Sequence, residues 1–390
     1  MNEAIYLYRY PLCVDLQQRH TMEKEASEII VVTGGSGFLG QHIIRQLLEQ
    51  ELFPLKEIRI FDLHEFQWVP GMEPYNNNSN ANLKSIKGDI CELEQLRKAC
   101  RDATIIIHSA AFIDVSTLPD EKKLQMVNVK GTENVIQSCI DNNVERLAFT
   151  STVDAYLPPT PFPTANVTED ETKTPSNFLM GSYGATKNIA DQLVIKADKT
   201  TLQNGNILRT CALRIGYMYG EGDKITRDLM ELPAKSKKNY PIGHDDHVIQ
   251  KIYAGNAAWA HVLAVHKLKD PSSASSPAGK SMFVGDDTPL KSLSAHFQPY
   301  VDGIGAVNSF RISFRLIYAV AAMMDFLAWL LQPIYSIRSN ITRSSILFSS
   351  NNYTVSWQLA RRCLGYKPLY TYNEGIARSV VYLKAALNVS

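Results

Sequence analysis

A glycine-rich loop between a strand and a helix is the feature that most constrains the fold of this chain. Residues 33–40 read Thr-Gly-Gly-Ser-Gly-Phe-Leu-Gly, with the spacing G-x-x-G-x-x-G. A β-branched run, residues 28–33, precedes the loop, and a helix is predicted over residues 40–49. Glycines let the backbone approach a pyrophosphate, and the helix N-terminus stabilises its charge. The loop therefore predicts a dinucleotide site with contacts from Gly34, Gly37, Phe38, Leu39 and Gly40.

Short apolar runs alternate with helical segments through the first half of the chain. Apolar strands joined by helical crossovers form parallel sheets that are covered on both faces. We therefore predict an α/β fold with a doubly wound, Rossmann-like parallel sheet. The expected strands are residues 28–33, 57–61, 84–87, 103–108 and 146–150, and the expected helices are 40–49, 92–99, 124–140 and 183–197.

The alternation weakens after residue 214, and composition suggests how the chain divides. The expected units are an N-terminal extension (1–27), the dinucleotide-binding domain (28–214), a smaller mixed substrate-binding region (215–310), a membrane-associated segment (311–335) and a C-terminal region (336–390).

The membrane-associated segment contains an apolar stretch at residues 316–331, in which Asp325 is the one charged residue. A spanning helix needs about 20 apolar residues, and an acid at its centre is unfavourable. Three interpretations stay open: a buried core helix, a spanning helix, and a helix that lies in the membrane surface. The third is preferred.

Charge and cysteine content narrow the functional classes. Lysine and arginine number 40 against 39 acidic residues, so the chain lacks the basic excess of a nucleic-acid-binding protein. The six cysteines form no C-x-x-C pair, so neither a zinc site nor a disulfide framework is indicated. We expect no nucleic-acid partner and no metal ion.

Acidic and small residues follow the later strands at positions that suit a dinucleotide. Asp62 lies 22 residues beyond the last loop glycine, where an acid accepts hydrogen bonds from the adenine-ribose hydroxyls. It would repel a 2′-phosphate, and no arginine follows it directly, so NAD is favoured over NADP. Asp89 and Ile90 are candidates for adenine contacts. Ala110 and Ala111 are small, as a backbone close to the cofactor requires.

Tyr183 and Lys187 form a Y-x-x-x-K motif, so the two side chains share a helical face. A phenol titrates near ~10, and a neighbouring cation lowers that pKa by stabilising the phenolate. We therefore predict that this pair transfers the proton beside the nicotinamide, whose positive charge adds to the effect. Ser151 and Thr152 follow the fifth strand, where ligands bind in such sheets. One of these hydroxyls is expected at the reacting oxygen, with Thr152 preferred.

These elements, in this order, resemble the extended short-chain dehydrogenase/reductase superfamily. Later runs make the chain similar to one family within it, the 3β-hydroxysteroid dehydrogenase/Δ5–Δ4 isomerase family, over about residues 28–385. Those runs are TCALR (210–214), YGEGD (219–223), YAGNAAWAH (253–261), DDTP (286–289), PIY (333–335) and YKPLY (366–370).

The resemblance implies oxidation of a steroid or sterol 3β-hydroxyl by NAD, followed by migration of the double bond. It implies that Tyr183 is the general base and Lys187 its electrostatic partner. By family position and elimination, Asp286 and Asp287 are candidates for the isomerisation. The resemblance also implies contact with membrane lipid, at the endoplasmic reticulum or mitochondria; a homodimer stays an open expectation.

The chain departs from the family pattern at a few positions. Ile215 stands where proline is expected, Thr152 where serine is usual, and residues 180–182 lack the family's prolines. Three other functions therefore stay open: a decarboxylating sterol-4α-carboxylate 3-dehydrogenase, a sugar-nucleotide epimerase, and a non-catalytic dinucleotide-binding scaffold.

Overall fold

The computed structural model describes most of the chain. The described residues are 28–50, 52, 54–74, 81–159, 166–243, 247–270, 276–332, 334–335, 337–349 and 352–389. The predicted extension at residues 1–27 lies outside them.

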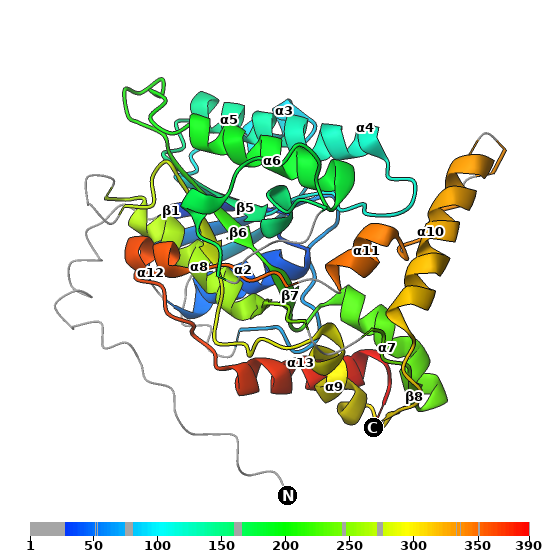
Figure 1. The fold of residues 1–390 in the computed structure, drawn as a ribbon. Coiled ribbons are helices and arrows are strands. Elements are labelled where there is room, and N and C mark those ends of the chain that lie inside the picture. The colour runs from blue at the N-terminus through cyan, green and yellow to red at the C-terminus, as the bar shows by residue number, and fades with distance from the viewer. Residues whose placement is uncertain are drawn as a thin grey trace, which may run out of the picture.

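A seven-stranded, all-parallel sheet forms the centre of the molecule, which confirms the doubly wound α/β prediction (Figure 1). Its strand order is β10-β6-β5-β4-β1-β2-β3. The order reverses between β1 and β4, and ligands bind beyond the strand ends at such a switch point. The strands are β1 (Glu28–Thr33), β2 (Leu55–Asp62), β3 (Asn82–Lys87), β4 (Ile105–His108), β5 (Arg146–Thr152), β6 (Arg209–Ile215) and β10 (Lys280–Val284).

Helices cover both faces of this sheet, as the apolar strands require. On one face lie α2 (Phe38–Glu49), α8 (Ala254–Lys267) and α12 (Gln358–Leu364). On the other lie α3 (Leu93–Ala99), α5 (Gly131–Asp141) and α6 (Gly181–Lys196) (Figure 1). The helix predicted over 124–140 is composite, because a π-helical turn, η1 (Gln125–Lys130), joins α4 (Glu121–Leu124) to α5.

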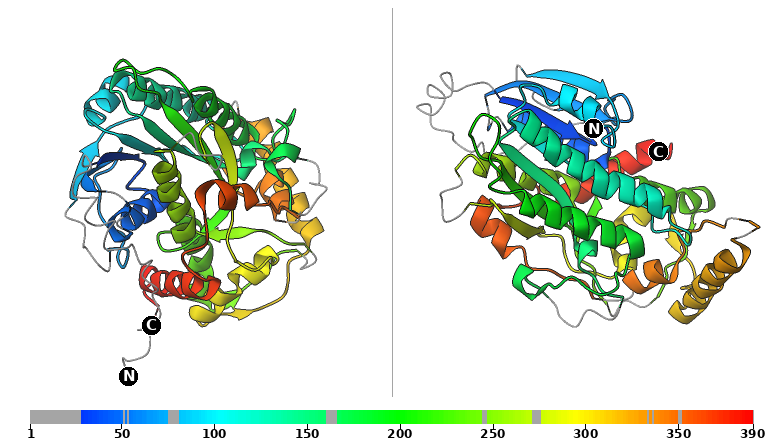
Figure 2. Two further views of the ribbon diagram at one scale, coloured as in Figure 1. Left: turned by 90° about the vertical axis from the view of Figure 1, so that its left-hand side faces the viewer. Right: turned by 90° about the horizontal axis from the view of Figure 1, so that it is seen from above.

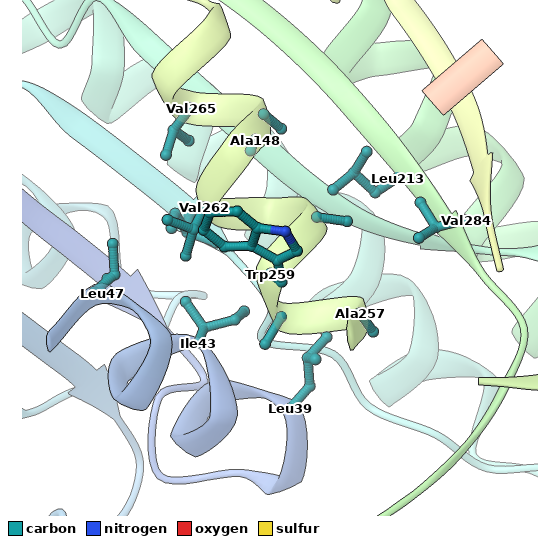
Figure 3. Packing of buried hydrophobic residues seen from close by; sticks show 14 of the residues in the cluster. Leu39, Ile43, Leu47, Ala148, Leu213, Ala257, Trp259, Val262, Val265 and Val284 are labelled. Atoms are coloured by element: carbon teal, nitrogen blue, oxygen red, sulfur yellow. The ribbon is translucent and has the colours of Figure 1, made fainter. Parts of the chain in front are cut away.

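The larger core cluster lies between α2, α8 and the sheet. Figure 3 shows Ile43 of α2 and Trp259 of α8 gathered with strand residues Ala148, Leu213 and Val284. All five side chains are buried. Burial of an aliphatic side chain contributes about 1.5–3 kcal/mol, so this cluster holds the glycine loop and α2 firmly against the strands.

Residues 215–310, the region predicted to bind substrate, contribute elements both to the main sheet layers and to two small two-stranded sheets. α8 and β10 belong to the main sheet layers, so the alternation does not end near residue 215 as we expected. β10 escapes notice in the sequence because only three of its residues, Met282–Val284, form an apolar run. The domain boundary after residue 214 stays a prediction.

The elements of the chain not yet named are β7 (Tyr217–Tyr219), α7 (Lys224–Ser236), β8 (Lys238–Asn239), β9 (Lys251–Tyr253), α9 (Leu293–Gly303), β11 (Val307–Asn308) and α13 (Tyr372–Ala386), with short 3-10 turns η2 (Val153–Ala155) and η3 (Glu169–Glu171).

The apolar segment forms helix α10 (Phe314–Leu331), followed by α11 (Arg343–Phe348). It lies at the periphery in every view (Figures 1 and 2), and by length and composition it could cross a membrane. The buried-core interpretation is wrong, because only Ala321 and Ala328 of this helix are buried. Asp325 is accommodated by an ion pair of 2.8 Å with Arg343. The large apolar side chains that α10 exposes are Leu316, Met323, Phe326, Trp329 and Leu330.

Candidate active site

The glycine loop leaves no room for side chains at two positions. Gly34 has a φ of +70°, and a Cβ there would lie 2.7 Å from the Ala110 Cα. A Cβ on Gly40 would overlap the carbonyl oxygen of Gly34, so α2 can pack against the loop only with glycine at this position. Gly37 is the N-cap of α2, and no acidic residue occupies the first turn. The positive end of the helix therefore stays available for an anion.

Asp62 lies against this loop at the end of β2. Its carboxylate accepts hydrogen bonds of 3.1 Å from the backbone amides of Ser36 and His64. This arrangement places an acid between the loop and the neighbouring strand, where a ribose hydroxyl would reach it. A narrow glycine turn, an uncapped helix N-terminus and this acid together fit the pyrophosphate and ribose of a dinucleotide.

The other predicted cofactor residues lie along the same edge. Ala110 contacts the glycine loop, whereas Ala111 is exposed next to it. The Asp89 carboxylate accepts a hydrogen bond of 2.9 Å from the amide of Cys91. Ile90 is buried, and a Cβ on Gly131 would overlap its side chain. Ile90 therefore packs in the core, and Asp89 stays the more accessible of the two candidates for adenine.

Tyr183 projects from the first turn of α6 toward the end of β5. Its side chain is buried, with Thr152 and Asp154 beside its hydroxyl. The preferred hydroxyl and the tyrosine of the motif are thus brought together. The pKa of Tyr183 is raised well above its usual value because of burial first and the Asp154 carboxylate second, with the Thr152 hydrogen bond acting in the opposite direction.

Lys187 is held by the end of β5. Its Nζ donates a 2.7 Å hydrogen bond to the Thr150 carbonyl and lies 4.1 Å from the ring centroid of Phe149. Burial lowers its pKa to about 7, against the attraction of Asp191. Burial and an adjacent carboxylate raise the pKa of Tyr183, so the lowering of this pKa by Lys187 together with a bound nicotinamide stays a prediction. The lysine instead secures the end of β5.

Asp154 is a functional candidate that the sequence did not reveal. It is two residues beyond Thr152, whose hydroxyl donates a 2.9 Å hydrogen bond to the Asp154 carboxylate. Burial raises the pKa of Asp154 to about 6, against the hydrogen bond from Thr152. Carboxyl groups that titrate near neutrality beside a hydroxyl network are suited to proton transfer. An acid in a strand-to-helix turn has no distinctive sequence pattern.

Ser151 is not brought to Tyr183. Its buried hydroxyl donates a 2.5 Å hydrogen bond to Asp191, which lies eight residues beyond Tyr183 on the same helix α6. Of the two neighbouring hydroxyls, Thr152 is the one beside the phenol. The geometry selects Thr152, the residue that the sequence preferred.

Asn128 is a second residue that sequence reasoning missed. It lies in the π-helical turn η1, and its side chain is buried. It accepts a 2.8 Å hydrogen bond from the Phe112 amide and donates to the Phe112 carbonyl (2.9 Å) and the Thr186 hydroxyl (3.1 Å). Asn128 thereby joins the loop after β4 to the turn of α6 that carries Tyr183. π-Turns are frequent at functional sites, but a single asparagine in a helical run does not predict one.

An apolar recess begins one residue beyond Thr152. It is lined by Val153 and Leu157 after β5, by Gly216 and Gly285 after two neighbouring strands, and by Phe348 of α11. The recess therefore opens along the same sheet edge as Tyr183 and has the character of a site for an apolar molecule.

Asp286 and Asp287 have other surroundings. Asp286 is buried and accepts hydrogen bonds from the Tyr253 amide (2.9 Å), the Asn256 side chain (2.8 Å) and the Thr288 amide (3.0 Å). Asp287 is exposed. The Asp286 carboxylate thus connects the end of β10 to the start of α8, and its hydrogen-bonding capacity is used by these three donors.

Comparison with known proteins identifies one family and one fold. Residues 31–316, well over half of the chain, match the 3-beta hydroxysteroid dehydrogenase/isomerase family. Among solved structures, an epimerase from Methanothermobacter thermautotrophicus is 15% identical, with a TM-score of 0.66 over 93% of this chain and 94% of that chain. A double mutant of dTDP-glucose 4,6-dehydratase from Streptomyces venezuelae, with NAD bound, is 20% identical, with a TM-score of 0.64 over 91% and 96%. Such identities show a shared fold.

Proposed function

Because this chain belongs to the 3-beta hydroxysteroid dehydrogenase/isomerase family, we propose that it oxidises the 3β-hydroxyl of a steroid or sterol with NAD and then moves the Δ5 double bond to Δ4. The observation that carries the proposal is the position of the Tyr183 phenol beside Thr152 and Asp154, one residue from an apolar recess that begins at Val153. The recess is lined mainly by apolar side chains, which suits a sterol.

The protein's own groups handle the proton and the position of the substrate. Bound NAD would accept the hydride from C3. Tyr183 takes the proton of the 3β-hydroxyl, which requires the positive charge of the bound nicotinamide to offset the raised pKa of the phenol, and the Thr152 hydroxyl lies beside the phenol. Lys187 supports this arrangement indirectly, because its hydrogen bond to Thr150 fixes the strand end that bears Thr152. The Gly34 loop and Asp62 hold the dinucleotide.

We assign the isomerisation to Asp154. The step removes a proton at C4 and returns one at C6, which needs a carboxyl group whose pKa lies near neutrality. Asp154 has a pKa of about 6 and contacts Thr152, whereas Asp286 is engaged by backbone and side-chain donors. In the Asp154→Asn variant, the 3-keto-Δ5 product should accumulate while NADH formation continues. Unchanged formation of the Δ4 ketone would overturn the assignment.

A panel of 3β-hydroxysteroids and sterols, offered with NAD and NADP in parallel, tests the dehydrogenase. We expect oxidation of at least one 3β-hydroxyl with NAD preferred, and none of the 3α epimer. In the Asp62→Ser variant, the preference for NAD should fall, because the carboxylate that repels a 2′-phosphate is gone. Oxidation of sugar nucleotides and not of steroids would contradict the proposal.

We propose further that α10 attaches the protein to a membrane, with the endoplasmic reticulum as the first candidate and mitochondria as the second. Phe326 and Trp329 are exposed and adjacent, with ring centroids 5.9 Å apart. The double substitution Phe326→Glu/Trp329→Glu should shift the protein from the membrane pellet to the soluble fraction. Val381→Glu replaces an equally exposed apolar residue on α13 and should not. Equal pelleting of all three proteins would contradict the proposal.

A further inference from the structure

Two chain segments meet at the N-terminal end of α10, and we call them the basic ribbon. One is residues 235–243, which end α7 and follow it; the other is residues 307–318, which lead into α10 and form its first turn. β8 and β11 pair within the ribbon, and the Ile312 amide donates a 2.8 Å hydrogen bond to the Pro241 carbonyl. Figure 1 shows α7 and β8 beside this end of α10. Segments that are distant in the sequence thus form one surface.

The charge of the basic ribbon has one sign. Its two segments hold five basic residues and no acidic one, whereas the whole chain has 40 basic and 39 acidic residues. Lys235, Lys237, Lys238 and Arg315 are exposed. Lys235 also pairs with Glu231 of α7 at 2.6 Å, but an exposed ion pair of this kind contributes little. Cations gathered on one surface of an otherwise balanced chain favour an anionic partner.

Exposed apolar and aromatic side chains accompany these cations. Phe310 is 69% exposed, and its ring centroid lies 5.0 Å from that of Tyr240 in the other segment. Leu232 of α7 and Leu316 of α10 are also exposed. Aromatic rings and cations at the end of an apolar helix are typical of a membrane–water interface. A bilayer offers acyl chains and charged headgroups together, whereas a nucleic acid offers no apolar phase for the two leucines.

We propose that the basic ribbon binds the anionic headgroups of a bilayer leaflet, an inference that rests on the membrane attachment through α10 proposed above. Lys235, Lys237, Lys238 and Arg315 contact the headgroups, and Phe310 enters the boundary between headgroups and acyl chains. α10 provides the apolar contact, which any phospholipid satisfies. The ribbon adds a preference for negatively charged lipid, because each cation close to an anionic surface is attracted to it.

Vesicle flotation with the full-length protein tests the proposal. One set of vesicles is phosphatidylcholine alone, and the other contains equal parts of phosphatidylcholine and phosphatidylserine. The ribbon variant is Lys235→Gln/Lys238→Gln/Arg315→Gln. The control Lys56→Gln/Lys98→Gln/Lys196→Gln removes the same charge from exposed positions of β2, α3 and α6. All three proteins should melt at similar temperatures, because the changed side chains are exposed.

The wild type should bind the phosphatidylserine vesicles at least ~10-fold more tightly than the neutral ones, and salt should reduce that preference. The ribbon variant should lose the preference and keep its binding to neutral vesicles, while the control keeps both. A preference that salt does not reduce, an equal loss in the control, or tighter binding of duplex DNA than of the anionic vesicles would overturn the inference.

The two vesicle types separate this inference from the attachment on which it rests. If the wild type binds both types equally, the ribbon proposal fails while the attachment through α10 stands. If it binds only the anionic vesicles, and the ribbon variant loses that binding, the attachment through α10 fails while the ribbon proposal stands.

Discussion

Two polar networks border helix α6, and they begin at neighbouring residues of β5. On one side, Ser151 donates to Asp191, whose carboxylate also accepts hydrogen bonds from Tyr156 (3.1 Å), Ser281 (2.7 Å) and the guanidinium of Arg214 (3.2 Å). On the other side, Thr152 joins Tyr183 to Asp154.

The networks differ in how fully their carboxylates are satisfied. Asp191 has four donor residues, one of which is the cation Arg214, so its charge is compensated inside the protein. Asp154 receives a side-chain hydrogen bond from Thr152, and burial leaves its pKa raised to about 6. A saturated network stabilises the fold, whereas a network with a perturbed acid and phenol can exchange protons with a ligand. The two sides therefore predict opposite effects on stability and turnover.

The largest effect should come from Asp191→Ala. Removal of this carboxylate leaves the buried guanidinium of Arg214 without a counter-ion, which should lower the free energy of unfolding by about 3–5 kcal/mol. Urea unfolding measures the change, and activity per folded molecule should stay close to that of the wild type. Near wild-type stability would show that the Asp191 network does not hold the fold.

Tyr183→Phe should act on the opposite side. The variant removes the proton-transfer group but keeps the ring, so turnover should fall by at least ~100-fold while stability and NAD affinity are retained. NADH formation and calorimetric titration with NAD measure the two properties. A variant that turns over normally would remove Tyr183 from the mechanism.

The two neighbouring hydroxyls sharpen the comparison. Thr152→Val should lower kcat about 10-fold or more with a small effect on melting, because it removes the hydroxyl beside Tyr183. Ser151→Ala should lower stability by about 1–2 kcal/mol and leave kcat nearly unchanged, because it removes one donor from a buried carboxylate. Identical profiles for both variants would contradict the division into two networks.

The last expected effect is a dependence of stability on pH. Asp154 has a folded pKa of about 6 against an ordinary value of 3.8, so between these pH values the folded protein keeps a proton that the unfolded chain has lost. The contribution of this group to stability is therefore present at low pH and is lost as pH rises through about 6. Urea unfolding of Asp154→Asn across this range should show a flatter dependence than the wild type. Parallel curves would indicate that Asp154 titrates normally.

The sequence predicted most of the Rossmann-like unit because its signals are local. β-Branched runs and the glycine spacing identified strands β1 to β5 with ends displaced by at most two residues. β10 was missed because its apolar run is short and its partner β6 is distant in the sequence. The exposure of α10 could not be predicted, since a core helix and a membrane helix share its composition.

The candidate site was predictable in its residue types and not in its electrostatics. The Y-x-x-x-K spacing and the strand-end hydroxyl led to Tyr183 and Thr152. The raised pKa of the phenol depends on burial and on Asp154, which no motif places beside it.

Transfer of the C3 hydrogen to NAD tests the central claim most directly. A 3β-hydroxysteroid labelled with deuterium at the 3α position is incubated with the wild type and NAD, and the reduced dinucleotide is analysed by mass spectrometry. The account predicts deuterium in the dinucleotide, formed at least ~100-fold more slowly by Tyr183→Phe. Unlabelled dinucleotide, or equal rates for both proteins, would contradict it.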